Sequence, residues 1–141
     1  EPRESIATIS NAMDVGAPSN FERMKTQWSY ERMSQLIKGC WIDDSETRKT
    51  IQDVKNNYSY ILDPHGAVAW SAVDRLVSKA ELDNSPVAVL ATAHPAKFSE
   101  TVEPVCGPVP VPESLASVMK RKVQSHRIPA DRDALYSVLP L

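Results

Sequence analysis

Hydrophobic positions divide the chain into runs that are apolar throughout and stretches in which apolar residues recur at helical spacing. Residues 6–9 and 40–42 are short runs suited to strands, and residues 87–91 are apolar without alternation. An uninterrupted apolar run is typical of a strand covered on both faces, as in a parallel sheet. The pattern therefore predicts three strands, of which 87–91 is the most buried.

Helices are predicted between and after these runs, where apolar residues recur three or four positions apart. Two of them have strong start signals, because an Asp side chain accepts hydrogen bonds from free amides and Pro suits the first helical position. Residues 104–112 are too rich in Pro for regular structure, and the tail is expected to be irregular. The predicted helices are a broken or paired helix over 18–39, helices that begin at Asp43 and at Asp63-Pro64, and helices over 95–102 and 113–122.

Strands that alternate with helices indicate the α/β class. The predicted fold is a partial three-layer sandwich, with a short, mostly parallel sheet flanked by helices. Residues 1–104 would form the α/β part, and residues 105–141 a Pro-rich connection, a helix and a tail that pack on it. A sheet of three strands leaves an edge open, so another chain should cover it or the protein should associate with itself.

Composition narrows the choice of partners. Apolar residues make up 42% of the chain and charged residues 24%, with a net charge of -2, which does not favour nucleic acid or an anionic membrane. No apolar run approaches the roughly 20 residues of a membrane span. Cys40 and Cys106 lack metal-site spacing and predict reduced thiols in a cytoplasmic protein. The first ten residues lack the features of a signal peptide, and we expect a chain that begins within a domain.

Candidate chemistry gathers after residues 87–91. Thr92 would stand at the carboxyl end of the predicted strand, where open α/β sheets bind ligands, so its hydroxyl either starts a helix or contacts a ligand. His94 is interpreted as a locally hydrogen-bonded histidine rather than a ligand contact. Lys97 is a solvated lysine or a contact for an anion at the helix start. The loop over 11–20 either contacts a substrate phosphate or is purely structural.

A metal site is not predicted. His65, His94 and the pair Asp43-Asp44 carry suitable atoms, but their spacing places no two of these groups on one helix face. The acidic pair is better explained as a helix start than as two catalytic carboxylates. We also find neither a GxSxG motif nor a phosphate-binding P-loop.

Four stretches, in order and at fitting spacing, resemble the threonine synthases of bacteria and fungi. The resemblance covers roughly residues 5–103 and extends more weakly into the tail. The last stretch is the most specific of the four. They are Ser-Asn-Ala-Met-Asp-Val (10–15) with Pro-Ser-Asn-Phe-Glu-Arg (18–23), Asp43-Asp44, Asp-Pro-His-Gly-Ala-Val-Ala (63–69), and Thr-Ala-His-Pro-Ala-Lys-Phe (92–98).

The resemblance implies a pyridoxal-phosphate (PLP) enzyme of fold type II, the class of the tryptophan synthase β subunit. The family converts O-phosphohomoserine and water to threonine and phosphate. It implies that Thr92 hydrogen-bonds the pyridine nitrogen of the cofactor. A neutral hydroxyl there does not hold a full proton on the ring, which moderates electron withdrawal.

Two family features are absent from this sequence. The lysine that holds the cofactor lies in a Phe-Lys-Asp context, and none of the eight lysines here follows a Phe. The cofactor phosphate sits in a loop of clustered glycines and asparagines, whereas the four glycines here are isolated. We therefore expect the C-terminal segment of a threonine synthase, which binds no PLP and is inactive without the N-terminal remainder. The alternative is a binding or interaction module that keeps the fold without catalysis.

Overall fold

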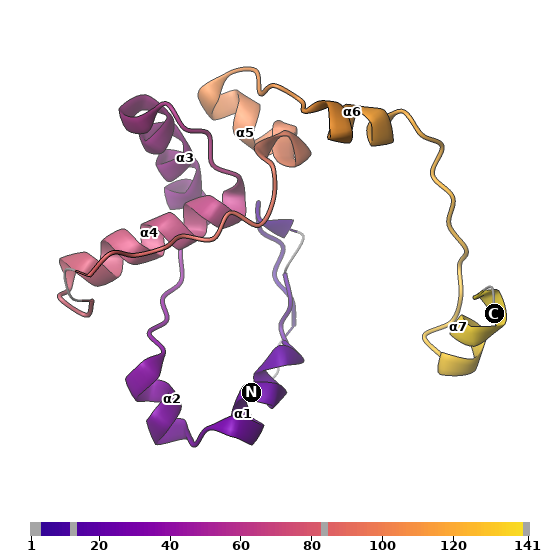
Figure 1. Cartoon of the computed structure of the whole chain (residues 1–141), viewed down its shortest axis with the longest axis horizontal. Helices are drawn as coiled ribbons and strands as arrows, with labels where there is room; N and C mark the ends of the chain where they lie inside the picture. Colours follow the sequence, from indigo (N-terminus) through magenta and orange to yellow (C-terminus); the bar gives the residue numbers. More distant parts are fainter. Residues whose placement is uncertain (1–3, 12–13, 83–84, 140–141) are drawn as a thin grey trace. The chain divides into compact units, whose positions relative to one another are not determined.

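The computed structural model describes residues 4–11, 14–82 and 85–139 (Figure 1). Contacts divide the chain into two compact units, Glu1–Pro110 and Val111–Leu141. The predicted division after residue 104 concerns the domains of a larger enzyme and stays a prediction. The elements of the first unit are α1 (Asn20–Gln27), α2 (Tyr30–Leu36), α3 (Asp44–Tyr58), α4 (Pro64–Ser78), the short 3-10 helix η2 (Pro95–Phe98) and α5 (Ser99–Cys106); those of the second are α6 (Glu113–Met119) and α7 (Arg132–Val138).

Two capping aspartates start the longest helices. The Asp43 carboxylate accepts a hydrogen bond from the Glu46 amide at 2.8 Å, and α3 begins at the next residue. The Asp63 carboxylate accepts from the His65 amide at 3.0 Å, with Pro64 at the first position of α4. Both caps satisfy amides that have no partner within their own helix. The predicted starts of α3 and α4 are confirmed.

The core lies where α3 packs against α4 and α5. Ile51 and Val102 are fully buried there, and Val54 is 2% exposed. Complete burial of an aliphatic side chain contributes about 1.5–3 kcal/mol. The hydroxyls of Thr50 on α3 and Ser71 on α4 add a hydrogen bond of 2.5 Å across the helix pair. These contacts make α3, α4 and α5 the part of the chain that builds its own interior.

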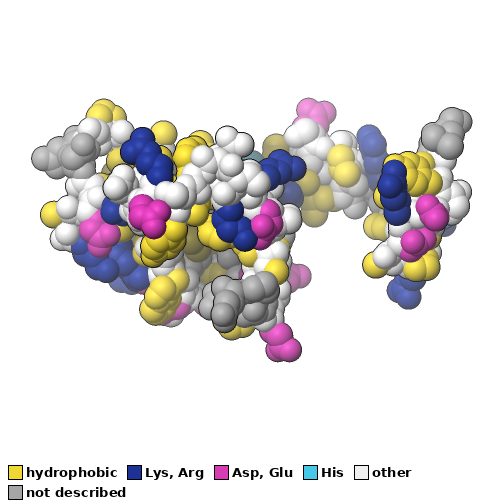
Figure 2. All heavy atoms as spheres, turned by 90° about the horizontal axis from the view of Figure 1, so that it is seen from below, with side chains coloured by type: hydrophobic (Ala, Val, Ile, Leu, Met, Phe, Trp, Pro, Cys, Tyr) yellow, Lys and Arg dark blue, Asp and Glu magenta, His cyan; other side chains and the backbone are white. Residues whose placement is uncertain are grey.

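The predicted break in the helix over 18–39 is confirmed. It falls between α1 and α2, where the Ser29 hydroxyl caps α2 by accepting from the Arg32 amide at 3.3 Å. The second helix ends at Leu36 rather than at Gly39. All eight residues of α1 are at least partly exposed, and Met33 is the buried residue of α2. Hydrophobic side chains on the surface are visible in yellow in Figure 2.

The predicted α/β class is wrong. Within the described ranges the chain forms helices and no strand. Residues 6–9, 40–42 and 87–91 were expected to pair in a sheet, but a strand exists only when a neighbour takes up its amides and carbonyls. The most apolar of these runs is uncovered, with Leu90 75% exposed and Val87 49% exposed. Without a sheet, the predicted partial sandwich and its open edge do not exist in the described part of this chain.

Two further predictions about the second half were partly right. The Pro-rich stretch over 104–112 was expected to lack regular structure; this holds for 107–112, but α5 continues through Pro104 and ends at Cys106, before Gly107 with a φ of +79°. The tail was expected to be irregular; this holds as far as residue 131, where Asp131 caps α7. Both cysteines are free thiols, as predicted. Among the described residues, no helix is long and apolar enough to cross a membrane.

Candidate functional site

Thr92 directly follows the run over 87–91. Thr92 and most residues of that run are exposed to solvent. Ala91 and Ala93, the neighbours of Thr92, line a cleft of about 470 Å³, together with Tyr60, His94 and other residues of the first unit. Its lining is mostly apolar with a few polar groups, which is the usual character of a small-molecule site. Thr92 is exposed and lies between the lining residues Ala91 and Ala93 in the chain, but it is not itself part of the lining.

His94 lines the cleft and also starts η2. Its Nδ1 accepts a hydrogen bond from the Ala96 amide at 3.1 Å. A neutral imidazole that accepts at Nδ1 carries its proton at Nε2, so His94 presents a donor there. The interpretation of His94 as a locally hydrogen-bonded residue fits this contact. Lys97, in the same short helix, is exposed.

Asp63 and His65 form a close pair at the start of α4. Asp63 is 2% exposed, and its Oδ1 lies 2.9 Å from His65 Nδ1. The imidazole and the Phe98 ring meet in an edge-to-face contact, with ring centroids 5.2 Å apart. Its Nε2 is buried and has no hydrogen-bond partner among the residues that the structure describes. The third and fourth family-like stretches therefore meet through the rings of His65 and Phe98.

Hydrogen bonds join Thr8 to Asp14, which lies in the loop over 11–20 that was considered for a substrate phosphate. Thr8 donates to Asp14 twice, from its amide at 2.9 Å and from its hydroxyl at 2.7 Å. These hydrogen bonds from Thr8, and the nearby His65, hold the pKa of Asp14 below its ordinary value. Asp44 accepts from the Ile9 amide at 3.2 Å and so ties this segment to α3. Ala12 and Met13 of the family-like stretch lie outside the described residues.

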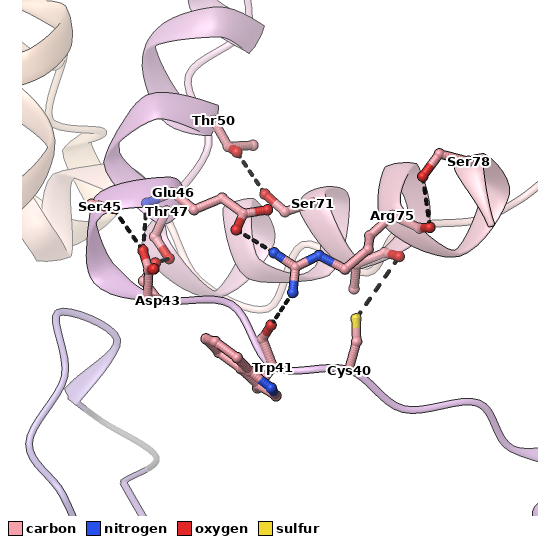
Figure 3. Close-up of polar contacts among 11 residues, drawn as sticks. Cys40, Trp41, Asp43, Ser45, Glu46, Thr47, Thr50, Ser71, Arg75 and Ser78 are labelled. Atoms are coloured by element: carbon pink, nitrogen blue, oxygen red, sulfur yellow. Dashed lines mark hydrogen bonds and ion pairs between the residues drawn. The ribbon is translucent and has the colours of Figure 1, made fainter.

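Arg75 joins three segments at the crossing of α3 and α4 (Figure 3). Its guanidinium donates to the Trp41 carbonyl at 2.6 Å and forms an ion pair with Glu46. The same guanidinium lies over the Trp41 ring, 5.7 Å from its centroid. This clamp holds residues 40–43 beside α4. These contacts all lie within the fold, which is the role of a stabilising clamp.

The groups considered for a metal do not assemble. Asp43 caps α3, and Asp44 is engaged with Ile9. In the part of the chain that the structure describes, no group of three His, Cys, Asp or Glu side chains could hold a metal ion. The acidic pair is thus a helix start, as predicted.

Sequence reasoning missed the pairing of Asp63 with His65 and the clamp of Arg75. The first had a local signal, because a capping Asp two residues before a His brings its carboxylate near the imidazole as well as the amide. Arg75 meets Trp41 across 34 positions of sequence, and nothing in the local pattern indicates that contact.

Comparisons with known proteins converge on one family. A family model described as "Threonine synthase, C-terminal" matches residues 66–139. Threonine synthase of Escherichia coli K12 is 33% identical over 98% of this chain, which spans 32% of that relative. Threonine synthase of Haemophilus influenzae is 38% identical over 82% of this chain and 26% of its own length. The chain thus spans about a third of the curated relatives it matches.

Solved structures agree with these relatives. The crystal structure of threonine synthase from Escherichia coli matches with a TM-score of 0.71 and 34% identity, over 98% of this chain and 32% of that one. The PLP-bound threonine synthase from Brucella melitensis matches with a TM-score of 0.60 and 31% identity, over 86% of this chain and 31% of that one. The likeness therefore extends from sequence to structure.

Proposed function

Because this chain belongs to the threonine synthase family, we propose that it forms the C-terminal part of an enzyme that converts O-phosphohomoserine and water to threonine and phosphate with PLP. The observation that carries the proposal is the match of nearly the whole chain to about a third of such an enzyme. PLP is named because one of the matching structures holds it.

Thr92 is the proposed contact of this chain to the cofactor. Two observations support this assignment: Thr92 is exposed, and its chain neighbours Ala91 and Ala93 line a cleft of mostly apolar character. When bound, PLP withdraws electrons from the reacting carbon of an amino acid. The Thr92 hydroxyl would donate a hydrogen bond to the ring nitrogen and leave that nitrogen without a full positive charge.

The test is Thr92→Val in the complete enzyme. Valine keeps the shape of threonine and removes the hydroxyl, so the rate of threonine formation should fall about tenfold, the effect of one neutral hydrogen bond. Thr92→Ser is the matched control, because it keeps the hydroxyl and should retain most of the rate. Equal rates for Thr92→Val and the unsubstituted enzyme would reject this role.

We propose further that these 141 residues alone neither bind PLP covalently nor catalyse the reaction. None of their lysines follows a Phe, and the sequence has no cluster of glycines and asparagines to hold a phosphate. The chain mixed with PLP should yield no stable lysine adduct after borohydride reduction. A stoichiometric adduct at one specific lysine, located by mass spectrometry, would contradict this.

The proposed partner is the N-terminal remainder of the same enzyme. The uncovered apolar run over 87–91 supports it, because exposed hydrophobic surface of this kind marks a contact with another surface. Self-association through the same surface stays a prediction. The proposed location is the cytoplasm, supported by two free thiols in a protein that forms no disulfide between them.

A further inference from the structure

The segment that carries Thr92 is fixed mainly by the residues on its C-terminal side. Before Thr92, the run over 87–91 has no strand partner among the described residues, and Leu90 is largely exposed. After Thr92, His94 caps η2, Ala96 is 5% exposed and Phe98 packs on His65. Within this chain, the contacts that hold Thr92 therefore come from η2; in the complete enzyme, the proposed cover over 87–91 would add to them.

Asp63 determines the orientation of the His65 ring. A carboxylate can only accept hydrogen bonds, so the contact of 2.9 Å between Asp63 Oδ1 and His65 Nδ1 places a proton on Nδ1. The same Oδ1 accepts the His65 amide at 3.0 Å, which fixes the backbone to which that ring is attached. Asp63 is itself buried and caps α4. The imidazole is thus held at two points by one rigid group.

His65 passes this orientation to Phe98. The two rings meet at an interplanar angle of 63°, an edge-to-face contact that depends on ring direction. Phe98 is the last residue of η2, a single turn whose other end is set by the His94 cap and by Pro95. A shift of the His65 ring would therefore move η2 as a unit, together with Thr92 three residues before it.

The buried Nε2 distinguishes His65 from a purely apolar core residue. That atom lacks a hydrogen-bond partner within the described residues, and a buried polar atom without one has a free-energy cost. A leucine of comparable size would avoid the cost, but it could neither be oriented by Asp63 nor make an aromatic contact with Phe98. The properties that distinguish His65 from leucine are those that fix the direction of its ring.

We propose that His65 is a positioning residue for the cofactor contact: oriented by Asp63, it holds Phe98 and η2 so that the Thr92 hydroxyl stands where the ring nitrogen binds. The inference rests on the proposed function of Thr92. Small misplacements of a reacting or binding group lower rates strongly, so loss of this support should affect turnover more than substrate binding.

The experiment is a double-mutant cycle in the complete enzyme, with His65→Leu, Thr92→Val and the two combined. Because His65 acts through Thr92, His65→Leu should lower kcat about tenfold alone and less than twofold when Thr92 is already Val, with KM little changed. The absorbance spectrum of the bound cofactor should change in the same direction for both single variants. If His65 had a purely structural role, the fold-losses in kcat of the two single variants would multiply in the double variant.

Two outcomes overturn the inference in different ways. If Thr92→Val lowers kcat and His65→Leu lowers it by the same factor in both backgrounds, positioning by His65 is rejected while the role of Thr92 stands. If Thr92→Val leaves kcat and the cofactor spectrum unchanged, the role of Thr92 and the inference fail together.

Phe98→Leu provides a second cycle in case His65→Leu does not fold. It keeps an apolar side chain on η2 and removes the aromatic ring that meets His65. Its effect on kcat should likewise shrink to less than twofold in the Thr92→Val background. Equal losses in both backgrounds would reject the path from His65 through Phe98 to Thr92.

Discussion

Two apolar regions of the first unit have opposite environments. Ile51 and Val102, on α3 and α5, are fully buried, whereas Leu90, in a run of five consecutive apolar residues, is 75% exposed. The difference does not lie in hydrophobicity, because the run over 87–91 is the more apolar sequence. It lies in the presence of an opposing surface: α3 finds one on α4 and α5, within the same chain. The exposed run therefore needs a surface that these residues do not supply.

The largest expected effect tests that contrast directly. Ile51→Ala removes a fully buried side chain and should lower the free energy of unfolding of this chain by about 2–4 kcal/mol. Leu90→Ala is the matched control and should change it by less than about 0.5 kcal/mol, because an exposed side chain loses little on truncation. Urea denaturation followed by circular dichroism measures both.

The same substitution at Leu90, made in the complete enzyme, tests whether the run over 87–91 is covered there. If the N-terminal remainder covers the run over 87–91, Leu90→Ala should become strongly destabilising there, by about 2 kcal/mol or more. A Leu90 effect that stays negligible in the complete enzyme would mean that this run remains uncovered, and the proposed interface would have to be placed elsewhere.

An intermediate effect is expected at the clamp between α3 and α4. Arg75→Met keeps most of the side-chain volume and removes the contacts to Glu46 and the Trp41 carbonyl, so stability should fall by about 1 kcal/mol. Arg48→Met is the control, since Arg48 is an exposed arginine on α3 that contacts the carbonyl of Asp44. If the two substitutions lower stability by the same amount in thermal unfolding, Arg75 does not act as a clamp.

The smallest expected effect is on the stability of the chain at acidic pH. Hydrogen bonds from the Glu46 amide and the Ser45 hydroxyl hold the pKa of Asp43 below its ordinary value. The folded form binds that proton less readily than the unfolded form, so this stabilisation is present above the unfolded pKa of about 3.9 and is lost as the pH falls through the folded pKa. Asp43→Asn still caps a helix but cannot titrate, and its stability should fall less between about pH 5 and pH 3.

Asp43→Ala is the control for that measurement, because alanine cannot cap at any pH. It should be less stable than the unsubstituted chain at about pH 7 and closer to it at about pH 3. Identical acid profiles for the Asn variant and the unsubstituted chain would show that the Asp43 carboxylate does not contribute to the pH dependence.

Local chemistry explains which parts of the fold could be predicted. The starts of α3 and α4 were found because Asp43 and Asp63-Pro64 determine them within a few residues. The helix α7 was missed although Asp131 caps it in the same way, since the short segment after it lacks a clear apolar repeat. The prediction of a strand over 87–91 was wrong for a different reason. An apolar run predicts burial, and burial depends on a partner that a local pattern does not reveal.

The candidate site was predictable to a similar extent. Thr92, His94 and Lys97 were singled out by their place after an apolar run; in the structure Thr92 is exposed, and His94 lines a cleft. Its contact to PLP was implied by family resemblance and stays a prediction. The pair Asp63 and His65, and its meeting with Phe98, became visible only when α4 and η2 were placed together in space.

Cys106 offers a chemical probe of the end of α5. It ends α5, where its thiol donates to the Val102 carbonyl at 3.2 Å, and burial raises its pKa. A thiol with a raised pKa reacts slowly with alkylating reagents, because the thiolate is the reactive form. Because the thiol is partly exposed, its labelling rate reports the local environment at the end of α5. Cys106 is thus a native chemical reporter for this end of the helix.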